Sequence, residues 1–224
     1  MAERSQLVQW RYVAALAGLL GLSGCAGVDD PTNSDVGKIG ALLYQKFSKM
    51  GADDSVQRER AAAVPFASMG VRLGSSSESM FVLATRTGDD LHWLGGKKLA
   101  LTTRRGRIVQ TVGFDHNLTG FTGLAPVPGK QTPMSTYLLD FAESSVYGVL
   151  VSCNPQDIGP ESILIIGVAH KTRHVVEDCA ASQLDWTFRN EFWADETGYV
   201  WKSIQYVAPD LDPLTIEALR PAAQ

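Results

Sequence analysis

The sequence lacks several features that would assign it to large classes of protein. It has no excess of positive charge, because its formal net charge is −4, and this disfavours non-specific binding to nucleic acid. Its N-terminal apolar run, Tyr12 to Leu22, is shorter than the roughly 20 residues that a transmembrane helix needs. No internal repeat is convincing, and strands do not alternate with long helices, so a parallel βαβ sheet is not expected.

Cysteine is scarce, with three residues in the chain, and the first of them follows the apolar run. Arg4 and Arg11 precede that run, which gives the anatomy of a secretory signal. Leu22-Ser23-Gly24-Cys25 has the leucine-small-glycine-cysteine order of the bacterial lipoprotein signal. We therefore predict that Cys25 is the acylated first residue of the mature protein. An ordinary cleaved signal with an incidental cysteine is the alternative.

This interpretation divides the chain into a signal peptide (1–24), a lipidated flexible tether (25–34) and a single mainly-β domain (35–224). Each buried methylene of an acyl chain contributes about 0.8 kcal/mol, so several chains give lasting attachment to a membrane. The residue directly after the cysteine, which sorting machinery is thought to recognise, is Ala26 and not an aspartate. By analogy with Gram-negative lipoproteins, this favours the outer membrane and a domain that faces the periplasm.

The two remaining cysteines, Cys153 and Cys179, would lie in an oxidising compartment, where a disulfide is expected. Such a bridge would stabilise the fold by roughly 3 to 4 kcal/mol on the chain-entropy model. His170 and His174 allow a zinc site to be drawn with these cysteines. Side chains four residues apart lie on the same face of a helix, but this segment has the pattern of two strands with a turn at Lys171, where that spacing does not bring them together. We therefore predict no metal and no cofactor.

Short segments rich in branched or aromatic residues dominate the chain after Pro65. They predict an all-β fold, mainly antiparallel, as a curved sheet or barrel. One or two short N-terminal helices precede it, from Asp35 to about Gly51 and over Asp53 to Ala63. The expected strands are 79–85, 98–103, 107–112, 136–141, 146–152, 162–170, 172–178, 185–193 and 199–207.

Two longer runs stand out: Trp93 with Leu101 to Phe114 (LTTRRGRIVQTVGF), and Asn190 to Gln205 (NEFWADETGYVWKSIQ). Both runs resemble the YjbF/GfcB family of lipoproteins. Val64 to Gly74 and Leu219-Arg220-Pro221 fit the same pattern, as does the Cys25 signal. The resemblance covers essentially the whole mature chain. It implies an outer-membrane lipoprotein associated with secretion of capsule or exopolysaccharide, with a barrel-like β domain and no established catalytic mechanism.

The residues themselves indicate no catalytic site, and we predict that the protein is not an enzyme. Ser75-Ser76-Ser77 follows a glycine but matches no nucleophile elbow. Acidic pairs such as Asp89-Asp90, Glu177-Asp178 and Asp195-Glu196 would provide the two carboxylates of a glycosidase. Each pair lies in a predicted turn or strand end, where solvated carboxylates are expected.

Binding is the better-supported interpretation. Arg104, Arg105 and Arg107 crowd one hairpin tip, where they would meet an anionic polysaccharide or form a solvated turn around a structural glycine. On the strand from Asp185, one face (Trp186, Phe188, Asn190, Phe192) is expected in the core. The other face offers Trp193 beside Arg189, either as a platform for a sugar ring or as aromatic packing between strands.

The sequence therefore predicts a lipid-anchored accessory protein of polysaccharide secretion that binds an export protein or the polymer. A carrier that encloses a lipid or acyl chain in a barrel cavity is the alternative. The oligomeric state is not defined by the sequence.

Overall fold

The computed structural model describes residues 54–63, 65–123 and 134–222. In this part of the chain, helix α2 (Asp54–Ala63) precedes twelve strands. The strands are β1 (Ser68–Leu73), β2 (Ser79–Thr87), β3 (Asp90–Gly95), β4 (Ala100–Arg104), β5 (Arg107–Val112), β6 (Gly120–Thr122), β7 (Ser135–Phe141), β8 (Val146–Ile165), β9 (Val168–Ala181), β10 (Trp186–Ala194), β11 (Val200–Gln205) and β12 (Leu214–Arg220). Short 3-10 turns η1 (Gly96–Lys98), η2 (Ala142–Ser144) and η3 (Ser182–Leu184) lie in the connections.

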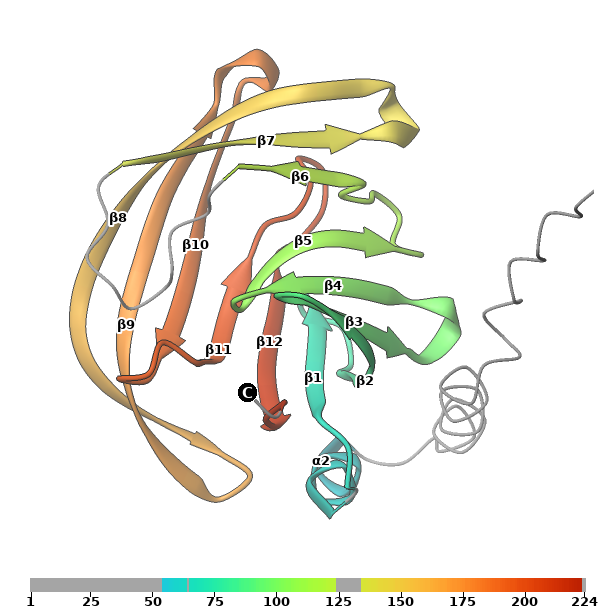
Figure 1. Cartoon of the computed structure of the whole chain (residues 1–224), viewed down its shortest axis with the longest axis vertical. Coiled ribbons are helices and arrows are strands. Elements are labelled where there is room, and N and C mark those ends of the chain that lie inside the picture. The colour runs from blue at the N-terminus through green and yellow to red at the C-terminus, as the bar shows by residue number, and fades with distance from the viewer. Residues whose placement is uncertain (1–53, 64, 124–133, 223–224) are drawn as a thin grey trace, which may run out of the picture.

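The strands form one antiparallel sheet in the order β5-β4-β3-β2-β1-β12-β11-β10-β9-β8-β7-β6. The sheet curls until its two edges approach each other (Figure 1). The Thr111 N–H donates to the Leu118 carbonyl at 2.8 Å, and the Leu118 N–H donates to Thr111 Oγ1 at 2.9 Å. The result is a nearly closed barrel, which confirms the predicted all-β class and the barrel-like sheet.

Alternation along the strands determines which side chains enter the barrel. On β10, Phe188, Asn190 and Phe192 are buried, whereas Thr187 and Arg189 are exposed. Successive side chains of a strand point to opposite faces of the sheet, so a two-residue period of this kind separates core from surface. Three of the four residues that the sequence assigned to the core face are therefore buried, and the fourth, Trp186, is partly buried against the core.

The barrel interior is filled by side chains in the described part of the chain. Its core contains Phe81, Trp93, Leu101, Tyr137 and Leu214, all at most 4% exposed. The interior thus resembles the close-packed core of a small barrel.

Two polar connections cross this interior between strands that are not neighbours in the sheet. Gln205 on β11 accepts a hydrogen bond from the Ile108 N–H and donates one to the Gly106 carbonyl, both at 2.9 Å. Arg107 on β5 donates to both carboxylate oxygens of Glu177 on β9, at 2.7 and 2.9 Å. Both connections tie the β4–β5 hairpin to the opposite wall.

A smaller apolar cluster joins α2 to the tip of the β8–β9 hairpin. Ala61 of α2, Ile165 of β8 and Leu219 of β12 form its buried centre. Arg58 also fixes α2 to the sheet through Glu78, at 2.6 Å. The partly buried side chains around the centre are Met80, Ile163, Ile166 and Trp201.

The long β8–β9 hairpin differs from the strands that the sequence predicted in this region. The segment Ser162–His170, expected to be one strand with a turn at Lys171, instead contains the reversal itself at Ile166-Gly167, both with positive φ.

β1, β3, β6 and β12 were not predicted. The helix expected over Asp53 to Ala63 is confirmed, while the signal, the tether and the helix expected from Asp35 lie outside the described residues.

Candidate functional site

Three hairpin turns meet at one mouth of the barrel and surround a pocket of about 280 Å³. They are the β2–β3, β4–β5 and β10–β11 connections, which lie at the same end because antiparallel hairpins reverse alternately at the two ends of a sheet. The described residues that line the pocket come mainly from these turns, from the adjoining strands and from the chain after β12. We call this feature the mouth pocket.

Aromatic side chains form part of the wall of the mouth pocket. Trp93 is held by a hydrogen bond from its Nε1 to Thr103 Oγ1 at 2.9 Å. Trp201 is held by a hydrogen bond from its Nε1 to Asp195 Oδ2 at 2.9 Å. Tyr199 stands edge-on to Trp201, with ring centres 4.9 Å apart. The aromatic wall is therefore fixed before any ligand arrives.

Burial affects the pKa of Tyr199 in this wall and of Asp195, which holds Trp201. Burial raises the pKa of Tyr199 to about 12, so the phenol stays neutral at physiological pH. Burial alone would raise the pKa of Asp195, but hydrogen bonds from Thr197 and Trp201 lower it below its ordinary value. Asp195 is thus a charged support for the Trp201 indole.

Charged side chains form the rim of the mouth pocket. Arg86 and Arg105 are exposed there, together with Asp89, which accepts a hydrogen bond from Arg105 at 2.7 Å. Lys202 also lines the pocket, and its ammonium lies 3.7 Å from a carboxylate oxygen of Glu217, which is not a lining residue. The rim thus carries two guanidinium groups and one carboxylate.

The β4–β5 turn closes over this end of the barrel at a glycine. Gly106 has φ +83°, and a Cβ placed on it would lie 2.4 Å from Val200 Cγ2 on β11. Only glycine permits both the positive φ and the close approach. The sequence assigned a structural role to this glycine, and the contact with β11 gives that role its reason.

The structure separates the three arginines that the sequence grouped at the turn of the β4–β5 hairpin. Arg104 pairs with Asp90 at 2.6 Å, and Arg105 lies on the pocket rim. The hydrogen bond from Arg104 lowers the pKa of Asp90 despite partial burial. Arg107 is 3% exposed and lies inside the barrel, so the grouping is corrected for this residue: it is not available to a polymer at the surface.

Arg189 and Trp193, the second predicted contact, do not form an open platform. Trp193 is only 6% exposed and stacks on His174 with ring centres 4.3 Å apart. Lys202 lies 4.9 Å from the indole centre. Arg189 is exposed but pairs with Asp178 at 2.8 Å. The structure favours packing between strands, which was the alternative interpretation of Trp193.

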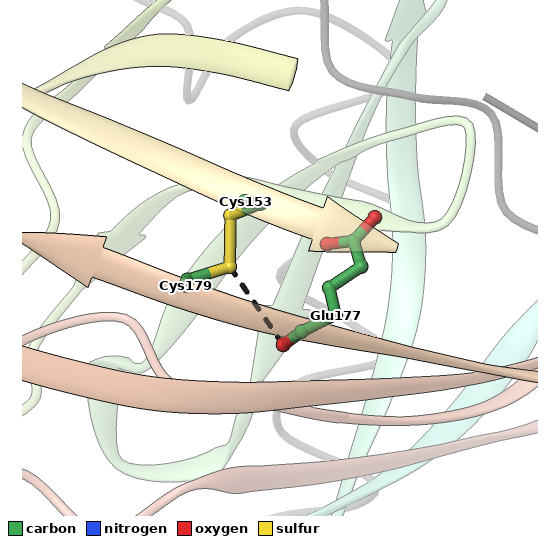
Figure 2. Close-up of side chains that lie close together, drawn as sticks. All are labelled: Cys153, Glu177 and Cys179. Carbon is green, nitrogen blue, oxygen red and sulfur yellow. Dashed lines mark hydrogen bonds between the residues drawn. A yellow bond between two sulfur atoms is a disulfide. The ribbon is translucent and has the colours of Figure 1, made fainter. Parts of the chain in front are cut away.

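The predicted disulfide is present between Cys153 on β8 and Cys179 on β9, which stand directly opposite each other (Figure 2). With Glu177, these sulfurs are the one cluster of metal-ligating types found among the described residues. The sulfurs are oxidised and the carboxylate binds Arg107, so this cluster offers no free thiolate. His170 stacks on Trp201 instead, at 3.7 Å between ring centres.

Sequence reasoning missed most of the mouth pocket. Its signal was present in the turn glycines Gly88, Gly106 and Gly198, since alternate hairpins of an antiparallel sheet must meet at one end. One aromatic lining residue, Trp201, lies at a bulge near the start of β11, where the pairing with β10 shifts register between Val200 and Lys202. A bulge of this kind has no clear sequence signature here.

Among the described residues, no helix has the length and apolar character that crossing a membrane requires.

Comparisons with known proteins assign the chain to a family. A family model described as "Group 4 capsule polysaccharide lipoprotein gfcB, YjbF" matches residues 40–219. The uncharacterized lipoprotein GfcB of Escherichia coli K12 is 23% identical over 205 residues, which cover 88% of this chain and 94% of that protein. The uncharacterized lipoprotein YjbF of the same strain is 23% identical over 181 residues, covering 77% and 81%.

A solved structure supports the fold independently. The crystal structure of the hypothetical lipoprotein YmcC from Escherichia coli K12 superimposes with a TM-score of 0.72 at 24% identity, covering 85% of this chain and 98% of that one. The family model, which matches residues 40–219, shows that the chain belongs to the YjbF/GfcB family of capsule-polysaccharide-associated lipoproteins.

Proposed function

We propose that this protein serves the secretion of capsule or exopolysaccharide by binding a stretch of acidic polymer in the mouth pocket. It would do so from the periplasmic face of the outer membrane, to which an acylated Cys25 holds it. The observation that carries the binding role is the combination, in one pocket, of a fixed aromatic wall and a rim with more guanidinium groups than carboxylates.

The anchor rests on two independent observations. The family is one of lipoproteins, which implies attachment to a membrane. The sequence Leu22-Ser23-Gly24-Cys25 supplies the acylation signal, and Ala26 after it favours sorting to the outer membrane. Export proteins at the same membrane are the partners from which the polymer would arrive.

The chemistry of the pocket fits an acidic sugar. Aromatic faces pack against the apolar face of a sugar ring, as the wall of Trp201 and Tyr199 would allow. A guanidinium group pairs with a carboxylate through two parallel hydrogen bonds. Arg86 and Arg105 stand at the rim where the acidic substituents of a bound sugar would lie.

The pocket supports binding better than catalysis. Asp89 is the one carboxylate among its described lining residues, and it faces a guanidinium group. Acid–base cleavage of a glycosidic bond requires two suitably spaced carboxyl groups. The family description likewise names a lipoprotein and no reaction.

The filled interior argues against the carrier alternative. A lipid carrier needs a large apolar cavity, whereas the interior of this barrel holds a packed core and the Arg107–Glu177 ion pair. The mouth pocket, at about 280 Å³, lies just below the range of about 300 to 1,000 Å³ that is usual for sites of drug-sized ligands. A few sugar units fit this size better than a long acyl chain.

Binding is tested with acidic fragments of the polymer that the producing cells export. Addition of these fragments should change the fluorescence of the pocket tryptophans. Arg86→Ala and Arg105→Ala should each weaken binding by about tenfold, the value of one charge-assisted hydrogen bond. Arg189→Ala is the matched control, because this exposed arginine lies outside the pocket. Equal binding of fragments whose carboxyl groups have been reduced would contradict the proposal.

The role in secretion is tested in cells that lack the protein. We expect loss of surface polymer, with restoration by the wild type and by Arg189→Ala. Cys25→Ser and the Arg86→Ala/Arg105→Ala double variant should fail to restore it. Unchanged polymer in the deletion strain would refute a role in secretion.

A further inference from the structure

The tip of the β8–β9 hairpin exposes apolar side chains that no described residue covers. Leu164 is 70% exposed and Val168 is 56% exposed, on either side of the Ile166-Gly167 turn. Isolated apolar residues are common on protein surfaces, but here they share one protruding turn with the partly buried Ile166. We call Leu164, Ile166, Gly167 and Val168 the hairpin tip.

The turn itself is occupied by an unexpected residue. A two-residue reversal with positive φ at both positions favours Asn, Asp or Gly at its first position. The chain places Ile166 there, at φ +47°, although a β-branched side chain is strained in that region. The Ile166 side chain packs against the Ala61–Ile165–Leu219 cluster, so the exposed apolar side chains of the turn are those of Leu164 and Val168.

The charge of the surrounding segment suits a phospholipid surface. From Ser162 to Lys171 the chain contains no aspartate or glutamate, while Lys171 is exposed and His170 lies next to it. Segments that lie at a membrane interface combine apolar side chains with basic residues that face the headgroups.

The chain enters the domain beside this tip. Helix α2 is the first described element, and its Ala61 packs directly with Ile165 of β8. Figure 1 shows α2 and the β8–β9 tip at the same end of the barrel. The 28 residues from 26 to 53 separate Cys25 from α2, so a lipid anchor would tether the domain on the side of the hairpin tip. Tethering raises the local concentration of the tip at the bilayer.

From these observations we infer that the hairpin tip inserts into the phospholipid bilayer to which the protein is anchored, as a second point of contact. The inference rests on the membrane anchor of the proposed function and not on its ligand. It also sets the orientation of the domain, because Trp201 lines the mouth pocket and stacks on His170 of the same hairpin. A tip in the bilayer turns the mouth pocket toward the membrane.

The test places a fluorescent label at the tip of the full mature chain. Cys25→Ser removes the acylation site, and an N-terminal histidine tag holds the protein on vesicles of phosphatidylethanolamine and phosphatidylglycerol that contain a nickel-chelating lipid. The result then does not depend on how the native anchor forms or on polymer binding. Since Cys153 and Cys179 are joined, Leu164→Cys provides the one free thiol for an environment-sensitive dye.

We expect the dye at position 164 to shift to the blue on vesicles and to be quenched by spin-labelled lipid. Leu150→Cys is the matched control, because Leu150 is an exposed leucine of the same strand toward its other end, and its dye should show neither change. Adding Val168→Asp to the position-164 sample should abolish both signals, whereas adding Thr187→Asp, at another exposed site, should not.

Two results would overturn the inference. One is a dye at position 164 that remains as exposed to water as the dye at position 150. The other is shielding at position 164 that grows with protein concentration in the absence of vesicles, which would assign the tip to a second copy of the chain.

Discussion

Removing one partner of the buried Arg107–Glu177 pair should destabilise the barrel strongly. The two side chains are 3% and 1% exposed and are joined by hydrogen bonds of 2.7 and 2.9 Å. Burial alone would lower the pKa of Arg107, but the charge of Glu177, a contribution from Tyr137 and the hydrogen bond to Glu177 together outweigh burial and hold the pKa above its usual value. Glu177→Gln leaves the burial and removes the compensating charge.

The magnitude follows from the desolvation of the arginine. Breaking a buried ion pair costs about 3 to 5 kcal/mol, because a charge stays in the interior without a partner. With glutamine at position 177 the guanidinium group keeps an amide oxygen as acceptor and its ring contacts, with Phe192 at 4.8 Å and Tyr137 at 5.8 Å, but it has no compensating charge. Against a total stability of about 5 to 15 kcal/mol, the loss should be conspicuous.

Urea unfolding with the disulfide intact measures this loss. Replacing both partners, as Arg107→Met with Glu177→Leu, should recover most of the stability, since an apolar pair of similar volume needs no desolvated charge. Arg105→Ala removes an exposed pair with Asp89 and should change the free energy of unfolding by less than about 1 kcal/mol. If Glu177→Gln were as mild as Arg105→Ala, the argument that the pair is electrostatically required would fail.

Three further predictions concern stability. Replacing both bridge cysteines by alanine should lower the free energy of unfolding by about 3.5 kcal/mol, the value of the chain-entropy model for a separation of 26 residues. Urea unfolding measures this loss, and an unchanged unfolding midpoint would contradict the model for this protein. Burial raises the pKa of Tyr137 and of Tyr199 to about 12. The unfolded chain therefore loses these protons first, so the stabilisation is complete below pH about 10 and is lost as pH rises toward 12. Absorbance at alkaline pH should show two tyrosines that titrate late, and uniform titration near pH 10 would refute their burial. Gly106→Ala should destabilise the protein by more than the roughly 1 to 2 kcal/mol that positive φ costs an alanine, because its Cβ would also clash with β11. Gly88→Ala is the control, since its Cβ meets open space and only the backbone cost is expected. Equal losses of stability in thermal unfolding would exclude the clash.

The parts of the fold that local pattern determines were predictable. β5 was predicted with its observed bounds, and the core face of β10 followed from alternation of Phe188, Asn190 and Phe192 with polar neighbours. The disulfide followed from cysteine count and compartment. For the two strands the evidence lies within a few neighbouring residues. For the disulfide it lies in the residue type, because cysteine in an oxidising compartment usually forms a bridge.

The parts that depend on distant partners were not predictable. Arg107 was placed at the surface because arginine is rarely buried without a partner, and its partner Glu177 lies 70 residues away on a strand that is not adjacent in the sheet. The β8–β9 reversal was missed because Ile166 occupies a position where asparagine or glycine would have marked a turn. β12 was missed although Leu214, Ile216 and Ala218 alternate with polar residues, because the strand directly follows the turn-forming residues Asp212 and Pro213.

The two proposals about this protein constrain each other through Trp201. This indole lines the mouth pocket and also stacks on His170 of the β8–β9 hairpin. If the hairpin tip enters the bilayer, a polymer reaches the pocket along the membrane surface, next to the place where it must leave the periplasm. If the tip stays in water while the pocket still binds acidic fragments, the mouth is free to face the periplasm, and the pocket would meet the polymer before it reaches the membrane. The label at position 164 therefore decides which step of secretion the pocket serves, whichever polymer it binds.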